Sequence, residues 1–207
     1  MYTKLMDEIG AEYNMSGSTR NYTAAGVARH VKKALARRFA GVKFSVKSST
    51  YSGGCSVSVK WIDGPTSEEV QAITRNYEGA GFDSMTDYKY YVRSWLNPQT
   101  LEAGFLNSEY NDEPRDLPAG AVAVSWAGCY MDEIRHLSQV GCKAIMAALA
   151  EEYGGGFGCN GKVYQVSELV IIPSKYDDTA YICLDAWDWD LHPTLNRFIY
   201  GYSLYEI

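Results

Sequence analysis

The chain has 207 residues, of which 46% are hydrophobic and 21% are charged, and its formal net charge is −6. This composition excludes a disordered chain, and the length allows one large domain or two small ones. Residues 1–60 hold 10 Lys and Arg against 3 Asp and Glu, whereas residues 61–207 hold 9 against 22. The basic part is suited to phosphate groups and the acidic part to a basic partner, unless the two parts face each other inside the fold.

Membrane insertion and secretion find no support in the sequence. The longest uncharged apolar stretch, GAVAVSWAGCYM at 120–131, is shorter than the roughly 20 residues that span a bilayer. No basic segment followed by an apolar segment begins the sequence. Five cysteines without CxxC spacing favour reduced thiols over a disulfide framework. We therefore expect a cytoplasmic protein with no membrane contact. The cysteines are Cys55, Cys129, Cys142, Cys159 and Cys183.

The first predicted elements are a helix over 3–13, a polar loop over 14–21 and a longer helix over 24–39. Thr23 is the expected N-cap of the longer helix, and Val27, Val31 and Leu35 form its apolar stripe. Basic residues occupy the other side of this helix. They are Arg29, Lys32, Lys33 and Arg37.

Two strands are predicted next because apolar and polar residues alternate over 42–48 and again over 55–63. The Gly53-Gly54 pair between them accepts positive φ and predicts a hairpin, with Lys43 and Lys47 on its wet face. Thr66 and Glu69 then form a capping box for another helix.

The rest of the chain predicts a short Tyr-rich strand near 88–91, an irregular stretch over 97–120, a helix over 138–153, and strands over 163–172 and 179–187. Helix, strand, turn and strand thus occur twice. We expect an α+β fold of two α-β-β units with a mainly antiparallel sheet. The expected domains are a basic unit over 1–96, a linker over 97–120 and an acidic unit over 121–207, which can also form one compact domain.

Catalytic motifs are weak. Gly156, Gly161 and Lys162 match Gly-x4-Gly-Lys, but Val163 replaces the Ser or Thr that binds magnesium, and the loop follows a helix rather than a strand. Cys129 and His136 make a conceivable nucleophilic pair, and Cys142 and Cys159 would complete a zinc site of unusual spacing. We expect no catalytic residue, no metal and no cofactor, and the Cys129–His136 enzyme is the third hypothesis.

Two surfaces are candidates for binding. The basic helix face with Lys43 and Lys47 is suited to nucleic acid, with Tyr51 available to stack on a base. The acidic and aromatic segment DDTAYICLDAWDWDL, together with the Tyr-rich strand, is suited to a protein partner. The expected partner contacts are Tyr88, Tyr91, Asp185, Asp188 and Asp190.

Three stretches carry a family resemblance: GVKFSVKSSTYSGGCSVSVKWIDGPTSEEVQAI at 41–73, GAGFDSMTDYKYY at 79–91, and RHLS at 135–138. The sequence resembles the large polyvalent protein-associated domain family, the twenty-ninth of that series, over about 23–91 and more loosely over 120–153. The resemblance implies a protein of a phage or conjugative element that acts in a bacterial host. It supplies no catalytic residues.

The resemblance leads to two binding hypotheses. The first is a non-enzymatic protein that binds and inhibits a host defence complex, such as CRISPR or restriction machinery. The second is an accessory module that binds DNA or RNA while the mobile DNA is established. Neither hypothesis specifies an oligomeric state.

Overall fold

A computed structural model describes residues 13–16, 19–106, 117–159, 162–183 and 193–205. Its contacts divide the chain into two compact units, each built from two parts of the sequence. The first unit lies within residues 1–59 and 70–133, and the second within 60–69 and 134–207. In the part of the chain that the structure describes, no helix is long and apolar enough to cross a membrane.

The predicted α+β class is confirmed, and most strand pairs are antiparallel. The first unit contains β1 (Tyr13–Ser16), β2 (Thr19–Tyr22), α2 (Ala24–Arg38), β3 (Ser45–Tyr51), η1 (Arg75–Tyr77), β5 (Ala80–Asp83), β6 (Tyr88–Tyr91), β7 (Ser94–Leu96), β8 (Ala103–Phe105) and β9 (Val122–Ser125). The second contains α4 (Gln139–Tyr153), β11 (Gly156–Cys159), β12 (Lys162–Gln165), η2 (Val166–Glu168), β13 (Val170–Pro173), β14 (Thr179–Cys183) and α5 (Pro193–Gly201). Three elements contain the positions where the chain leaves one unit and enters the other, so each has residues in both units. They are β4 (Gly54–Ile62), α3 (Ser67–Thr74) and β10 (Cys129–Ser138).

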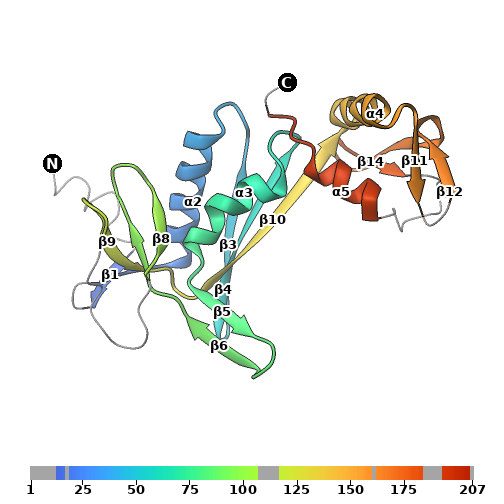
Figure 1. Ribbon diagram of the computed structural model, residues 1–207. Coiled ribbons are helices and arrows are strands. Elements are labelled where there is room, and N and C mark those ends of the chain that lie inside the picture. The colour runs from blue at the N-terminus through green and yellow to red at the C-terminus, as the bar shows by residue number, and fades with distance from the viewer. Residues whose placement is uncertain (1–12, 17–18, 107–116, 160–161, 184–192, 206–207) are drawn as a thin grey trace. The chain divides into compact units, whose positions relative to one another are not determined.

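The N-terminal helix α2 forms where the sequence predicts it. The Thr23 side chain accepts a hydrogen bond of 3.2 Å from the Gly26 amide and so caps the first turn. Val27, Val31 and Leu35 are fully buried and each removes a large apolar side chain from water. Figure 1 shows α2 alongside β3, against which it packs.

The predicted hairpin is also present, although its first strand begins and ends three residues later than expected and its second strand begins and ends one residue earlier. β3 continues to Tyr51, and the turn consists of Ser52 and Gly53, where Gly53 has φ +88. Along β4, Cys55, Val57 and Val59 are buried and alternate with half-buried serines. This alternation defines an apolar face and a polar face of the hairpin.

The loop predicted over 14–21 is wrong, because this segment forms the antiparallel pair β1 and β2. β2 also pairs in parallel with β9, which joins Arg20 to Val124 and Asn21 to Ser125. The five strands lie in the order β1-β2-β9-β7-β8. Pairing with a distant strand overrides the polar composition of the segment. The helix predicted over 3–13 falls almost wholly outside the described residues.

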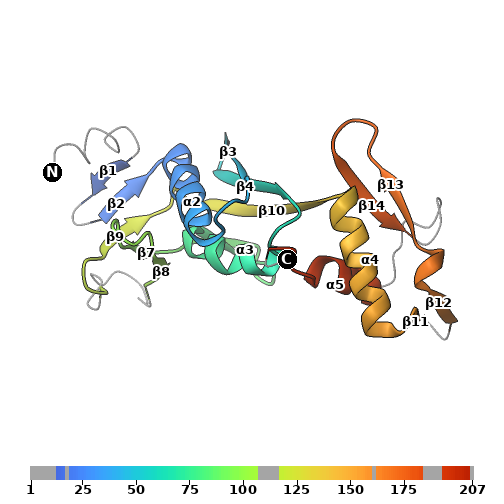
Figure 2. The same cartoon turned by 90° about the horizontal axis from the view of Figure 1, so that it is seen from above.

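The second unit packs α4 against β13 and β14 (Figure 2). Ser138 caps α4 by accepting a hydrogen bond of 3.0 Å from the Gly141 amide, and Gly154, with φ 60, ends the helix in the left-handed region. Both ends were predicted. The core contains Leu137, Cys142, Ile145, Leu149, Val166, Leu169, Ala180, Ile182 and Ile199.

Candidate functional site

The cationic face of α2 is the clearest charged feature of the first unit. Residues 13–62 hold nine Lys and Arg and no Asp or Glu. Four of the basic residues lie three or four positions apart on the solvent side of α2, so they share one helix face. We call this set the basic stripe, and it consists of Arg29, Lys32, Lys33 and Arg37.

Lys43 and Lys47 are exposed but do not join the basic stripe. Phe44 is buried with its ring 6.0 Å from that of Phe39, the residue that ends α2, so it faces the helix. Lys43 and Lys47 have the opposite parity along this extended segment and therefore point away from α2. The six basic residues expected to bind nucleic acid thus lie on two different faces of the first unit.

An aromatic hairpin is the second exposed feature of this unit. β5 and β6 pair from Ala80 with Tyr91 to Asp83 with Tyr88. The predicted contact residues Tyr88 and Tyr91 are 56% and 72% exposed. Three further exposed side chains, Phe82, Met85 and Tyr90, extend this surface, and the first two were not identified from the sequence.

Lys89 fixes the aromatic hairpin to the β3–β4 turn. Its Nζ donates to the Gly53 carbonyl at 3.0 Å and lies 4.8 Å from the centre of the Tyr130 ring and 5.5 Å from that of Tyr91. These contacts satisfy the ammonium group internally. Lys89 therefore anchors the aromatic hairpin to the β3–β4 turn.

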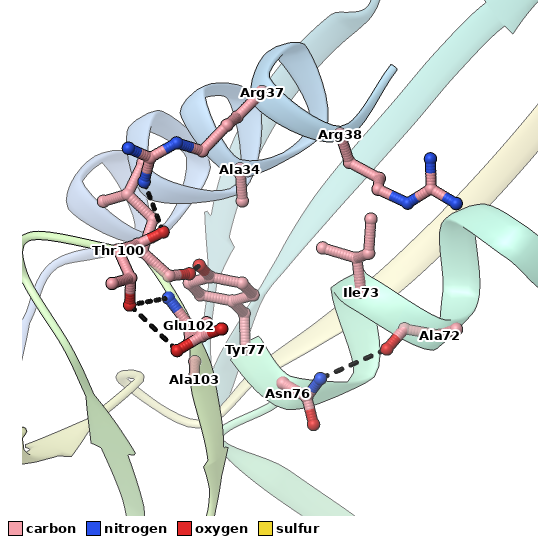
Figure 3. Close-up of a pocket in the computed structure, with 11 residues that line it drawn as sticks. Ala34, Arg37, Arg38, Ala72, Ile73, Asn76, Tyr77, Thr100, Glu102 and Ala103 are labelled. Atoms are coloured by element: carbon pink, nitrogen blue, oxygen red, sulfur yellow. Dashed lines mark hydrogen bonds between the residues drawn. The ribbon is translucent and has the colours of Figure 1, made fainter. Parts of the chain in front are cut away.

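A pocket of about 350 Å³ opens at the C-terminal end of α2 (Figure 3). The Arg37 Nη1 donates to the carbonyls of Gln99 and Thr100, the first at 3.2 Å. The Tyr77 hydroxyl donates to the Leu101 carbonyl at 2.7 Å. The lining residues are Ala34, Arg37, Arg38, Ala72, Ile73, Asn76, Tyr77, Thr100, Leu101, Glu102 and Ala103.

The turn that forms one wall of this pocket lies inside the stretch expected to be a linker. The Asn97 side chain accepts hydrogen bonds from the amides of Gln99 and Thr100, at 2.9 and 3.2 Å. Leu101 has φ +61, a conformation that non-glycine residues adopt only when their surroundings hold it. No residue of this wall was identified from the sequence.

The cysteines do not support an enzyme. Cys55 and Cys129 form a disulfide with Cα atoms 4.6 Å apart, so the expectation of reduced thiols is wrong for this pair. Cys129 therefore has no thiol to pair with His136. Burial and the charge of Asp63 raise the pKa of Cys142 to about 11, which keeps this thiol protonated at neutral pH.

The remaining motifs have structural explanations. Gly156 lies in β11, which pairs with β12 in a hairpin, so the segment that resembles a phosphate loop leads into no helix. Among the described residues, no cluster of three or more His, Cys, Asp or Glu side chains is arranged to hold a metal. The predicted acidic contacts Asp185, Asp188 and Asp190 lie outside the described residues.

Two of the quoted sequence stretches meet in the second unit. Asp63, from the DGPT sequence, accepts hydrogen bonds from the Ser138 amide at 2.8 Å and the Ser138 hydroxyl at 2.6 Å. Arg135, from the RHLS sequence, is buried and donates to the Gly64 carbonyl at 3.1 Å. It also donates to the carbonyls of Tyr200 and Tyr202. These groups connect the two parts of the sequence that form the second unit, and their role is structural.

Residues 22–112 match the family model described as Large polyvalent protein associated domain 29. The match confirms the family resemblance and supports an association with phages and mobile elements. The matched segment contains the basic stripe, the aromatic hairpin and every residue that lines the pocket, whereas RHLS lies beyond it. No curated protein and no solved structure matches the chain.

Proposed function

We propose that this chain is a non-enzymatic mobile-element protein that binds nucleic acid through its first unit. The basic stripe on α2 is the observation that carries the proposal. Nine cations without one carboxylate over residues 13–62 make this part of the chain attractive to a polyanion. The four residues of the stripe follow one side of the helix over about 12 Å, at 1.5 Å per residue. Contacts of this kind go to phosphates and carry little sequence specificity.

Binding of a fluorescent single-stranded oligonucleotide across a series of salt concentrations tests this function. Each phosphate contact contributes about 0.7 to the slope of log K against log salt. The double variant Lys32→Gln, Lys33→Gln should therefore lower the slope by about 1.4 if both side chains contact phosphate. Lys143→Gln with Lys175→Gln removes two exposed lysines from the second unit and is the matched control. Equal slopes for the two double variants would refute the assignment.

The aromatic hairpin favours a second candidate function, the binding and inhibition of a host defence complex such as CRISPR or restriction machinery. Its five exposed large apolar side chains form the kind of surface from which hot spots of protein interfaces are built. Tyr88→Ser with Tyr91→Ser should abolish inhibition of a defence nuclease. Tyr176→Ser, at a residue 96% exposed in the second unit, is the control. Unchanged inhibition would exclude the hairpin as the contact surface.

The acidic residues Asp185, Asp188 and Asp190 belong to the same second candidate. Asp188 and Asp190 alternate in sequence with Trp187 and Trp189, and their negative charges favour a partner with a basic surface. Asp188→Lys with Asp190→Lys should weaken inhibition of the nuclease. Retention of full inhibition would remove these residues from the predicted interface.

A further inference from the structure

We infer that the polar face of the β3–β4 hairpin is a second nucleic-acid surface, on which the bases of a single strand stack against tyrosine rings. Along β3 the positions in phase with Lys43 and Lys47 point away from α2, and the last of them is Tyr51. This surface is therefore separate from the basic stripe. The inference goes beyond the proposed function, because the stripe contacts phosphates whereas this face contacts bases.

The Tyr51 ring lies across the end of the hairpin. Tyr51 and Gly54 flank the two-residue turn, and the Tyr51 hydroxyl donates to the Cys55 carbonyl at 3.4 Å. A Cβ atom at Gly54 would lie only 3.2 Å from the Tyr51 Cε2 atom, so the ring rests on bare backbone there. Tyr51 is nevertheless 50% exposed. The ring is thus held in place while much of its surface faces solvent.

Tyr91 repeats this arrangement next to Tyr51. A Cβ atom at Gly128 would lie 2.7 Å from the Tyr91 Cε1 atom, so this exposed ring also packs on glycine backbone. The Lys89 ammonium group connects the two rings. A Cβ atom at Gly54 would lie 2.9 Å from Lys89 Nζ, close to its contact with Tyr51, and the same Nζ is 5.5 Å from the centre of the Tyr91 ring. The two rings therefore belong to one surface.

Tyr130 extends this surface onto β10, the strand beside β4. Cys129 is bonded to Cys55 on the apolar side, so the next residue of β10 points to the polar side. The centre of the half-buried Tyr130 ring lies 4.8 Å from Lys89 Nζ. Three rings thus surround one lysine, which fixes their positions before a ligand arrives.

The charges on this face favour a polyanion. Lys47 is exposed four positions before Tyr51 on the same side of β3, about 14 Å away at 3.4 Å per residue, and Lys43 is exposed four positions earlier. The exposed carboxylate of Asp132 limits the cationic surface on the β10 side. We therefore expect the strand to run along β3, with bases on the rings and phosphates on the two lysines. Bases in a duplex already stack on each other, so free rings favour a single strand.

Two strands of about ten nucleotides, an oligothymidylate and an abasic strand with the same phosphates, test the inference with the full chain. The wild type should bind the oligothymidylate about a hundredfold more tightly, because two stacked bases contribute about tenfold each. Tyr51→Leu with Tyr91→Leu should abolish this preference, and Tyr51→Phe with Tyr91→Phe should retain it because the rings remain. Tyr90→Leu is the control, since Tyr90 is 46% exposed but alternates to the other face of β6.

This surface and the basic stripe can fail separately. Lys32→Gln with Lys33→Gln should weaken both strands alike and leave the preference for bases intact. Lys47→Gln should lower the salt slope by about 0.7 for the oligothymidylate. Equal affinities of the wild type for the two strands, or a preference that persists in the leucine double variant, would overturn the inference even when the stripe binds phosphate. Loss of nuclease inhibition in that variant with an unchanged preference for bases would assign the rings to a protein partner instead. If neither strand binds, the proposed function fails as well.

Discussion

His30 makes the stability of the first unit depend on pH. The residue is 5% exposed, and its ring packs at a right angle against that of Tyr22, with 4.9 Å between the centroids, and lies 6.2 Å from that of Trp126. The buried Nδ1 has no hydrogen-bond partner among the described residues. Burial, and then the charge of Lys33, lower the pKa of His30 from 6.5 to about 4. The folded protein therefore keeps this imidazole neutral.

The sign and size of the effect follow from proton linkage. Between pH 6.5 and about 4 the unfolded chain binds a proton at His30 that the folded protein does not. Stability is therefore complete above pH 6.5 and falls as the pH falls through this window. At 1.36 kcal/mol per pKa unit, the loss between pH 7.5 and pH 5 is about 2 kcal/mol, and the limit at lower pH is about 3 kcal/mol.

Urea unfolding of the wild type and of His30→Phe at pH 7.5 and pH 5 measures this loss. Phenylalanine keeps a ring in the aromatic cluster and cannot titrate. The quantity compared is the change in the free energy of unfolding between the two pH values within each protein. A packing cost of the substitution that is the same at both pH values therefore cancels. The raised pKa of the half-buried Glu78, caused first by burial, acts in both proteins alike. The reasoning is refuted if the wild type and His30→Phe lose the same stability over this interval.

Three further substitutions test interactions inside each of the two units. Cys55 and Cys129 are 74 residues apart, so Cys55→Ala with Cys129→Ala should lower the free energy of unfolding by about 4 kcal/mol; alkylation of both thiols in unfolded, unreduced wild type would contradict the disulfide. Ser138→Ala removes the N-cap of α4 and a hydrogen bond to Asp63, and should lower the free energy of urea unfolding by about 1–2 kcal/mol. An unchanged free energy would show that this cap does not stabilise the helix. Arg135→Met leaves the carbonyls of Gly64 and Tyr202 without their donor and should lower the midpoint of thermal unfolding of the second unit. An unchanged midpoint would show that these hydrogen bonds add no stability.

Local signals in the sequence predicted the elements that depend on nearby residues. Thr23 and Ser138 cap α2 and α4, and the backbone amides of Thr66 and Glu69 bind each other's side chains at 2.7 and 3.1 Å, as the capping-box spacing predicts. Each of these interactions joins positions three residues apart. The basic stripe follows from the same helical period, because cations three or four residues apart must share a face.

Predictions that needed a distant partner were incomplete or wrong. The polar segment at 14–21 became strands because β9 pairs with β2, and Cys55 met Cys129 because β4 and β10 are neighbouring strands. The composition of these segments contains no signal for either pairing.

The sequence by itself determined that α2, α3 and α4 form, where they begin and which face of α2 carries positive charge, whereas α5 was not predicted. Only the tertiary structure decided that Lys43 and Lys47 point away from the basic stripe, that the aromatic hairpin is exposed, and that a turn inside the expected linker closes a pocket against Arg37. The physical reason is range: capping and helical periodicity act over four residues, whereas the pairing of β2 with β9 and the contact of Arg37 with the pocket turn join residues more than sixty positions apart.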